Sequence, residues 1–152
     1  MQHAAIKRPA AMAPAALARV GDHYRTLDLN SRVDAASPHA LVAMLFTGLR
    51  EAIGAAQRST TSVGAAPALQ RLRAVTRALA IVDALSGSLD FARGGSVAIA
   101  LADAYAHARA LIVLGNEEAR ADAFAAAAGH IAELQASWNA IAAPASIWPS
   151  AN

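Results

Sequence analysis

The sequence predicts an all-α protein, an antiparallel four-helix bundle with a flexible N-terminal arm. Apolar residues recur at steps of three and four in four separate stretches, and no stretch of strand length alternates with period two. The chain is 56% hydrophobic and only 16% charged, with alanine prominent, so it can form a core and favours helices. The connections are mostly short, which makes consecutive helices antiparallel neighbours.

The first predicted helix runs from about Pro38 to Arg58. Ser37 is a suitable N-cap because its hydroxyl can accept from the free amides of the first turn, and Pro38 suits the first helical position. On a helical wheel, its large apolar side chains fill an arc of roughly 200°. A helix that lies on one core needs a stripe only a little over ~100° wide. The excess raises the question of what covers the flank of this helix.

The second predicted helix follows the loop STTSVGAAP, which Pro67 closes. Arg73 and Arg77 fall on its polar face, and Gly87 is a candidate end. The sequence RGGS at residues 93–96 indicates a break before the third helix. The apolar positions of the second helix step by three and four: Leu69, Leu72, Val75, Leu79, Val82 and Leu85.

The third predicted helix has Asp103 and His107 opposite its apolar side. The sequence LGNEEA then predicts a tight joint, with Gly115 in the left-handed position that ends a helix and Asn116 as the next N-cap. Glu117 and Glu118 would lie in the first turn of the fourth helix, where the helix dipole favours negative charge. The apolar side of the third helix consists of Val97, Leu101, Ala104, Tyr105, Ala108, Leu111 and Ile112.

The fourth predicted helix ends at Pro144, and Trp138 continues its apolar series, so we expect Trp138 in the core. That series is Phe124, Ala127, Ala128, Ile131, Leu134, Trp138 and Ile141. The expected division of the chain is a flexible N-terminal extension and arm (1–35), a bundle domain (36–143) and a C-terminal tail (144–152). A signal peptide is the alternative for the N-terminus, although Pro9 and Pro14 interrupt its Ala-rich run.

No pattern of residues predicts catalysis, a metal site or a cofactor. The chain has no cysteine, its five histidines include no pair spaced i, i+4, and it lacks a phosphate-binding loop and a nucleophile elbow. None of its histidines stands in the sequence typical of a histidine phosphotransfer domain. We therefore expect a protein that is not an enzyme.

Nucleic acid and membrane insertion are also not expected. The net charge is +2, and only Arg71, Arg73 and Arg77 cluster, which a solvated helix face explains. No apolar run approaches the ~18 residues of a membrane span.

Residues 33–49, VDAASPHALVAMLFTGL, resemble the start of the flagellar secretion chaperone family, FliS, and the resemblance continues to about residue 141. Tyr24 stands at about the place of the family's N-terminal tyrosine. Two departures are Thr47, where the family usually has an acidic residue, and the "ADA" that separates Leu101 from Tyr105. The matching residues are Val33, Ala36, Ser37, Pro38, Leu41, Met44, Leu45, Phe46, Gly48, Leu85, Ser88, Leu89, Asp90, Gly94, Gly95, Leu101, Tyr105 and Trp138.

The resemblance implies a cytoplasmic export chaperone. Such a protein binds the C-terminal segment of flagellin, prevents premature polymerisation and presents the flagellin to the export apparatus, whose gate components are further candidate partners. It also implies that the second helix extends to about Ser88–Asp90, with Gly87 inside it. The alternative is a helical-bundle adaptor for another protein–protein interaction.

A partner helix is then expected to share the flank of the first helix, and Tyr24 and Leu27 are expected to dock over the same surface in the free protein. The competing interpretation is that the whole apolar arc packs inside the bundle. The candidate partner-binding residues are Tyr24, Leu27, Val33, Leu41, Met44, Leu45, Leu85, Leu89, Leu101 and Tyr105.

Overall fold

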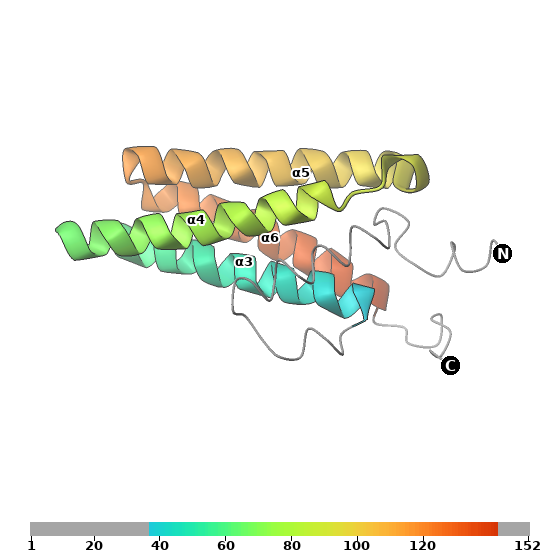
Figure 1. Cartoon of the computed structure of the whole chain (residues 1–152), viewed down its shortest axis with the longest axis horizontal. Coiled ribbons are helices and arrows are strands. Elements are labelled where there is room, and N and C mark those ends of the chain that lie inside the picture. The colour runs from blue at the N-terminus through green and yellow to red at the C-terminus, as the bar shows by residue number, and fades with distance from the viewer. Residues whose placement is uncertain (1–36, 143–152) are drawn as a thin grey trace.

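The computed structural model of the chain describes residues 37–142. These residues form four helices: α3 (Pro38–Thr60), α4 (Ala65–Gly87), α5 (Phe91–Glu118) and α6 (Ala121–Ala142). Consecutive helices run antiparallel through short connections (Figure 1). The predicted four-helix bundle is thus confirmed, whereas the expected arm at 1–35 and tail at 144–152 lie outside the described residues.

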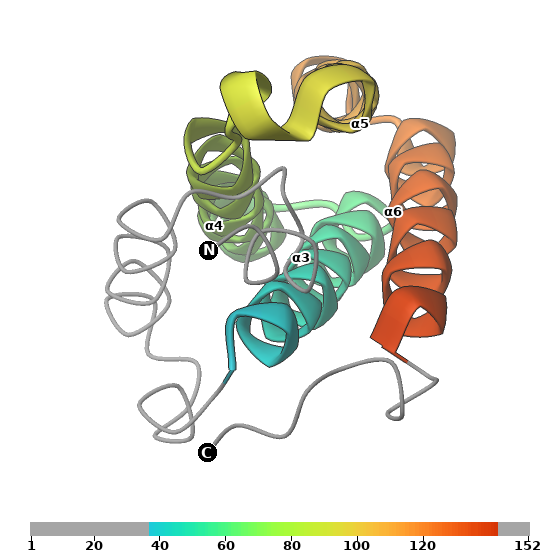
Figure 2. The same cartoon turned by 90° about the vertical axis from the view of Figure 1, so that its right-hand side faces the viewer.

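The helices surround one apolar core to which all four contribute. Viewed end-on, α3 and α5 occupy opposite corners of the bundle, with α4 and α6 between them (Figure 2). α3 packs along both α4 and α6, and α5 packs on the same two helices from the other side. Each of α4 and α6 therefore joins α3 to α5.

The wide apolar arc of α3 is covered within the chain except at the half-buried Met44, because α4 lies on one flank and α6 on the other. This corrects the expectation that a partner helix shares that flank, and it supports the competing interpretation. The Ser37 hydroxyl caps the helix as predicted, accepting from the Ala40 N–H at 3.1 Å. The buried residues of α3 are Leu41, Val42, Leu45, Phe46, Gly48, Leu49, Ala52, Ile53 and Ala56.

α4 begins at Ala65, earlier than predicted, and includes Pro67 in its first turn. Proline is tolerated there because first-turn N–H groups have no partner within the helix. Leu69 and Leu72, predicted on the packed side, are instead 47% and 52% exposed. The first turns of α4 extend past the ends of α5 and α6, so those helices cannot cover these leucines (Figure 1).

The connection from α4 to α5 is short and capped at both ends. Gly87 is the last residue of α4, and the buried Ser88 follows it, donating its hydroxyl to the Leu85 carbonyl at 2.7 Å. The Asp90 carboxylate then caps α5 by accepting from the Arg93 N–H at 3.0 Å. The break predicted at RGGS is a kink within α5, where Gly95 has φ 52° and ψ −126°, a conformation that favours glycine.

The joint between α5 and α6 lies further along the chain than predicted. α5 continues to Glu118, and Ala119 rather than Gly115 takes the left-handed position. Glu117 and Glu118 are therefore in the last turn of α5, where the helix dipole disfavours them. Gly115 serves packing instead, since a Cβ at this position would stand 2.9 Å from the ring of Phe124.

Trp138 joins the end of α6 to the start of α3, and its prediction as a core residue is confirmed at 6% exposure. Its indole N–H donates to the His39 carbonyl at 2.9 Å. Its ring stacks on the His39 imidazole, with centroids 4.6 Å apart, and meets Phe46 edge-on at 6.4 Å. Burial in this cluster lowers the pKa of His39.

We predict that Gly115→Ala destabilises the bundle by about 1–3 kcal/mol, because the added methyl overpacks the Phe124 contact. Gly129→Ala is the matched control. A Cβ on Gly129 has nothing within 4 Å, so this change should stabilise α6 by about 0.5–1 kcal/mol. Urea unfolding measures the change in the free energy of unfolding for both variants. Equal shifts for the two variants would contradict the assigned role of Gly115.

We predict that Trp138→Ala lowers the free energy of unfolding by about 3–5 kcal/mol, as truncation of large buried aromatic residues does. Trp138→Phe should lower the free energy of unfolding less, since an aromatic ring is kept, although the smaller phenyl group fills less of the core and the hydrogen bond to the His39 carbonyl is lost. An unchanged urea midpoint for the alanine variant would show that Trp138 contributes nothing to the core.

Candidate functional site

Four of the predicted partner-binding residues are core residues. Leu45, Leu85 and Tyr105 are at most 1% exposed, and Leu41 is 7% exposed. Burial raises the pKa of Tyr105 far above its usual range. The structure therefore corrects the expectation that these side chains contact a partner, because the bundle encloses them.

The remaining predicted residues divide into two groups. Met44, Leu89 and Leu101 are half-buried at the edge of the core, where each still has accessible surface. Tyr24, Leu27 and Val33 lie outside the described residues.

α5 differs from the other helices because it is apolar on all sides. Its core side carries Ala98, Tyr105, Ala108, Ile112 and Gly115. At about 100° per residue, a second apolar row lies away from the core side, between Asp103 and Arg109. We call this row the α5 outer strip, and it consists of Ile99, Ala102, Ala106, Ala110 and Val113.

The α5 outer strip is largely uncovered. Ile99 is 56% exposed, Ala106 and Ala110 are exposed, and Ala102 and Val113 are half-buried. Only 22% of the most apolar 18-residue stretch of α5 is buried. A helix that is hydrophobic all round is usually covered all round, so α5 lacks a covering element within the described residues.

Length and composition alone would also allow α5 to cross a membrane, contrary to the expectation that no stretch is long enough. In the bundle, however, Tyr105 and Ile112 of α5 complete the core. Arg109 also pairs with Asp83 of α4 at 3.1 Å. These contacts are those of a bundle helix.

The apolar surface of α5 continues towards its N-terminus around the kink at Gly95. Phe91 is 53% exposed and Val97 is 60% exposed. Val97 was predicted on the packed side, but that side begins at Ala98. Together with the half-buried Leu89 and Leu101, these residues extend the accessible apolar surface to the α4–α5 connection.

The shape of the α5 outer strip suits a helical ligand. Alanine side chains keep the middle of the strip shallow, so a second helix can approach closely, and Ile99 and Val113 stand near its two ends. Recognition of an amphipathic helix by an apolar surface depends on contacts with this spacing. The strip can therefore bind an apolar helix face, and nothing in it supplies a catalytic group.

Thr47, where the resemblance departs from its family pattern, has a polar contact within the chain. Its hydroxyl oxygen accepts from the Gln135 side-chain amide at 2.8 Å, and the Gln135 carbonyl accepts from Arg50 at 3.0 Å. This network joins α3 to α6 on the surface of the bundle.

His107 and His130 meet across α5 and α6, with ring centroids 5.0 Å apart, a pairing that sequence spacing did not indicate. Among residues 37–142, no group of three or more His, Cys, Asp or Glu side chains could hold a metal ion.

Sequence reasoning missed the α5 outer strip, although a signal was present. In VAIALADAYAHARALIV, residues 97–113, only Asp103, His107 and Arg109 carry polar heads beyond the tyrosine hydroxyl. On a helical wheel, apolar side chains surround residues 97–113 more completely than they surround the first predicted helix, so the same question of what covers it applies to this helix.

Comparison with known proteins gives two matches. The family described as "Flagellar protein FliS" matches residues 20–145 of this chain. The protein named "Flagellar secretion chaperone FliS" from Salmonella typhimurium (strain LT2) is 27% identical over 128 residues, which cover 84% of this chain and 93% of that protein. The family match spans the four described helices.

Proposed function

This chain belongs to the flagellar protein FliS family, and on that premise we propose that it is a flagellar export chaperone. We propose that it binds the C-terminal segment of flagellin in the cytoplasm, keeps flagellin from polymerising and presents it to the export apparatus. The relative from Salmonella typhimurium carries the name of a flagellar secretion chaperone, which supports this assignment.

The observation that carries the proposal is the uncovered α5 outer strip. An amphipathic helix of flagellin lying along Ile99, Ala106 and Val113 would give α5 the apolar cover that the bundle does not supply. The exposed Phe91 and Val97 would extend the contact around the kink. Among the residues first predicted for this role, Met44, Leu89 and Leu101 remain candidates at its margins.

The energetics suit a chaperone that must release its client. A client segment that is disordered when free uses about 2–5 kcal/mol of the gross interaction for ordering while burying ~1,000–3,000 Å². Such a segment covers a large surface without extreme affinity, so the chaperone can bind it specifically and still release it at the export apparatus.

The direct test is co-purification of this chain with full-length flagellin and with flagellin that lacks its C-terminal segment. We expect capture of the full-length protein only. Equal capture of both forms would contradict the proposed mode of binding and would favour the helical-bundle adaptor.

We predict that Ala106→Glu weakens binding of the flagellin C-terminal peptide by about tenfold or more. The carboxylate would have to lose its water against an apolar helix without gaining a partner. Ala125→Glu on α6 is the matched control, because Ala125 is also an exposed helical alanine. Isothermal titration calorimetry measures both, and circular dichroism verifies folding. Equal losses in the two variants would rule out the α5 outer strip as the contact.

We further propose that residues 1–35 act as an arm that competes with the client through Tyr24 and Leu27. Tyrosine suits such a site, since it combines an apolar ring with a polar tip. Deletion of residues 1–32 should leave the bundle folded, raise the binding of an apolar dye, and tighten or leave unchanged the affinity for the flagellin peptide. Loss of peptide binding with an intact helical circular dichroism spectrum would show instead that the arm contributes to the flagellin-binding site.

A further inference from the structure

The turn between α3 and α4 lies at the opposite end of α4 from the α4–α5 connection, and arginines are frequent in the residues around it. Residues 52–82 contain four arginines and no Lys, Asp or Glu, so this segment has a formal charge of +4. The whole chain is +2, so the other residues sum to −2. This stretch covers the last turns of α3 and most of α4, and Arg58, Arg71 and Arg73 lie in the part nearest the turn.

The four arginines have no counter-ion in the part of the chain that the structure describes. Arg58, Arg71, Arg73 and Arg77 form no ion pair within residues 37–142, whereas Arg109 and Arg120 each pair with a carboxylate. The Nε atoms of Arg71 and Arg77 are also buried without a hydrogen-bond partner. The exposed guanidinium groups of Arg58 and Arg73 are therefore available to a ligand, whereas Arg71 and Arg77 are half-buried.

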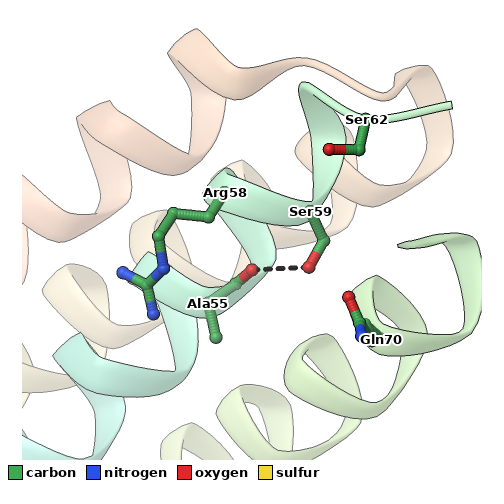
Figure 3. Close-up of a pocket in the computed structure, with 5 residues that line it drawn as sticks. All are labelled: Ala55, Arg58, Ser59, Ser62 and Gln70. Atoms are coloured by element: carbon green, nitrogen blue, oxygen red, sulfur yellow. Dashed lines mark hydrogen bonds between the residues drawn. The ribbon is translucent and has the colours of Figure 1, made fainter. Parts of the chain in front are cut away.

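An open pocket of about 330 Å³ lies where the end of α3 meets the start of α4. Arg58, Ser59 and Ser62 line it from the α3 side, and Gln70 lines it from α4 (Figure 3). The Ser59 hydroxyl donates to the Ala55 carbonyl at 2.8 Å. Arg58, Ser62 and Gln70 keep free side-chain donors that a carboxylate can accept from.

Apolar side chains stand beside these donors. Val63 is fully exposed at the turn, and Leu69 and Leu72 are about half exposed one helical turn apart on α4. Arg73 lies on the same exposed side, four residues after Leu69. We call this surface the basic tip, and it consists of Arg58, Val63, Leu69, Gln70, Leu72 and Arg73.

We propose that the basic tip is a docking site for an acidic, amphipathic segment of a partner protein. Carboxylates of the segment would pair with Arg58 and Arg73, and its apolar side chains would cover Val63, Leu69 and Leu72. Charge complementarity of this kind accelerates association and selects partners.

The composition of the tip favours a protein segment over other anionic partners. Single-stranded nucleic acid is held by aromatic side chains on which bases stack, and residues 52–82 contain no Phe, Tyr or Trp. A helix that lies on a membrane buries a broad apolar face, whereas the tip exposes three aliphatic side chains. An acidic peptide uses both the arginines and these aliphatic groups.

The tip does not depend on the proposed client site. The two surfaces share no residue, because the client surface consists of residues of α5 and of the α4–α5 connection, whereas the basic tip lies within residues 58–73. Variants of one surface therefore leave the side chains of the other unchanged, and a failure of one assignment leaves the other testable.

The experiment uses the full chain and a synthetic helical peptide of about 14 residues with Glu and Leu on opposite faces. A second peptide has Gln in place of each Glu. Fluorescence anisotropy is measured for the parent protein, for Arg58→Glu, Arg73→Glu and Leu69→Ser, and for the control Arg93→Glu. Arg93 is an exposed arginine without an ion pair in the described residues and stands at the other end of α4.

We expect the Glu peptide to bind, and the Gln peptide to bind at least about tenfold more weakly. Each of the three tip variants should lower the affinity for the Glu peptide by about tenfold, whereas Arg93→Glu should change this affinity by less than about twofold. Raising the salt concentration should weaken binding further.

Three results would overturn the proposal. The first is no binding of the Glu peptide up to about 1 mM. The second is an equal loss of affinity for the Glu peptide in Arg93→Glu and in the tip variants. The third is tighter binding of duplex DNA, or of vesicles containing phosphatidylserine, than of the peptide at the same salt concentration.

Discussion

The burial of α3 on both flanks is the constraint on which the rest of the bundle depends. α3 presents an apolar arc too wide for one neighbour, so it needs α4 on one side and α6 on the other. Each large aliphatic or aromatic side chain buried in this way contributes about 1.5–3 kcal/mol. With α4 and α6 held by α3, the remaining helix can pack only across them at the opposite corner (Figure 2).

The position of α5 follows from this arrangement and explains its exposure. A corner helix contacts its two neighbours through one side, here the row that contains Tyr105 and Ile112. Its outer side has no neighbour within the described residues, yet the sequence makes that side apolar as well. The apolar sides of α3, α4 and α6 and the core side of α5 pack together in the bundle. The uncovered outer side of α5 supports the proposed binding of flagellin.

The two ends of α4 differ in chemistry. At its C-terminal end, Ser88 and Asp90 form tight caps beside the accessible apolar surface of α5. At its N-terminal end, α4 extends past α5 and α6, which exposes Leu69 and Leu72 among unpaired arginines. The offset of α4 along the bundle relative to α5 and α6 therefore creates a second surface, whose charge suits an acidic ligand rather than an apolar one.

The sequence by itself determined the four helices, the Ser37 cap, an interruption at the RGGS motif and the core position of Trp138. Each of these depends on residues within a few turns, where spacing and capping chemistry are visible in the sequence. The joint at Gly115 was assigned wrongly, because local rules assign a glycine there to a helix end. Only the contact with the Phe124 ring, nine residues away, shows why glycine is required.

The tertiary structure decided which apolar side chains are enclosed and which are left outside. The family resemblance made Leu45, Leu85 and Tyr105 candidate contacts, yet they are core residues, while Leu69 and Val97, which periodicity placed on the packed sides, are exposed. Periodicity states that a side of a helix is apolar, but it does not state what covers that side. Cover depends on the corner that a helix occupies and on how far its neighbours extend, and both are properties of the assembled bundle.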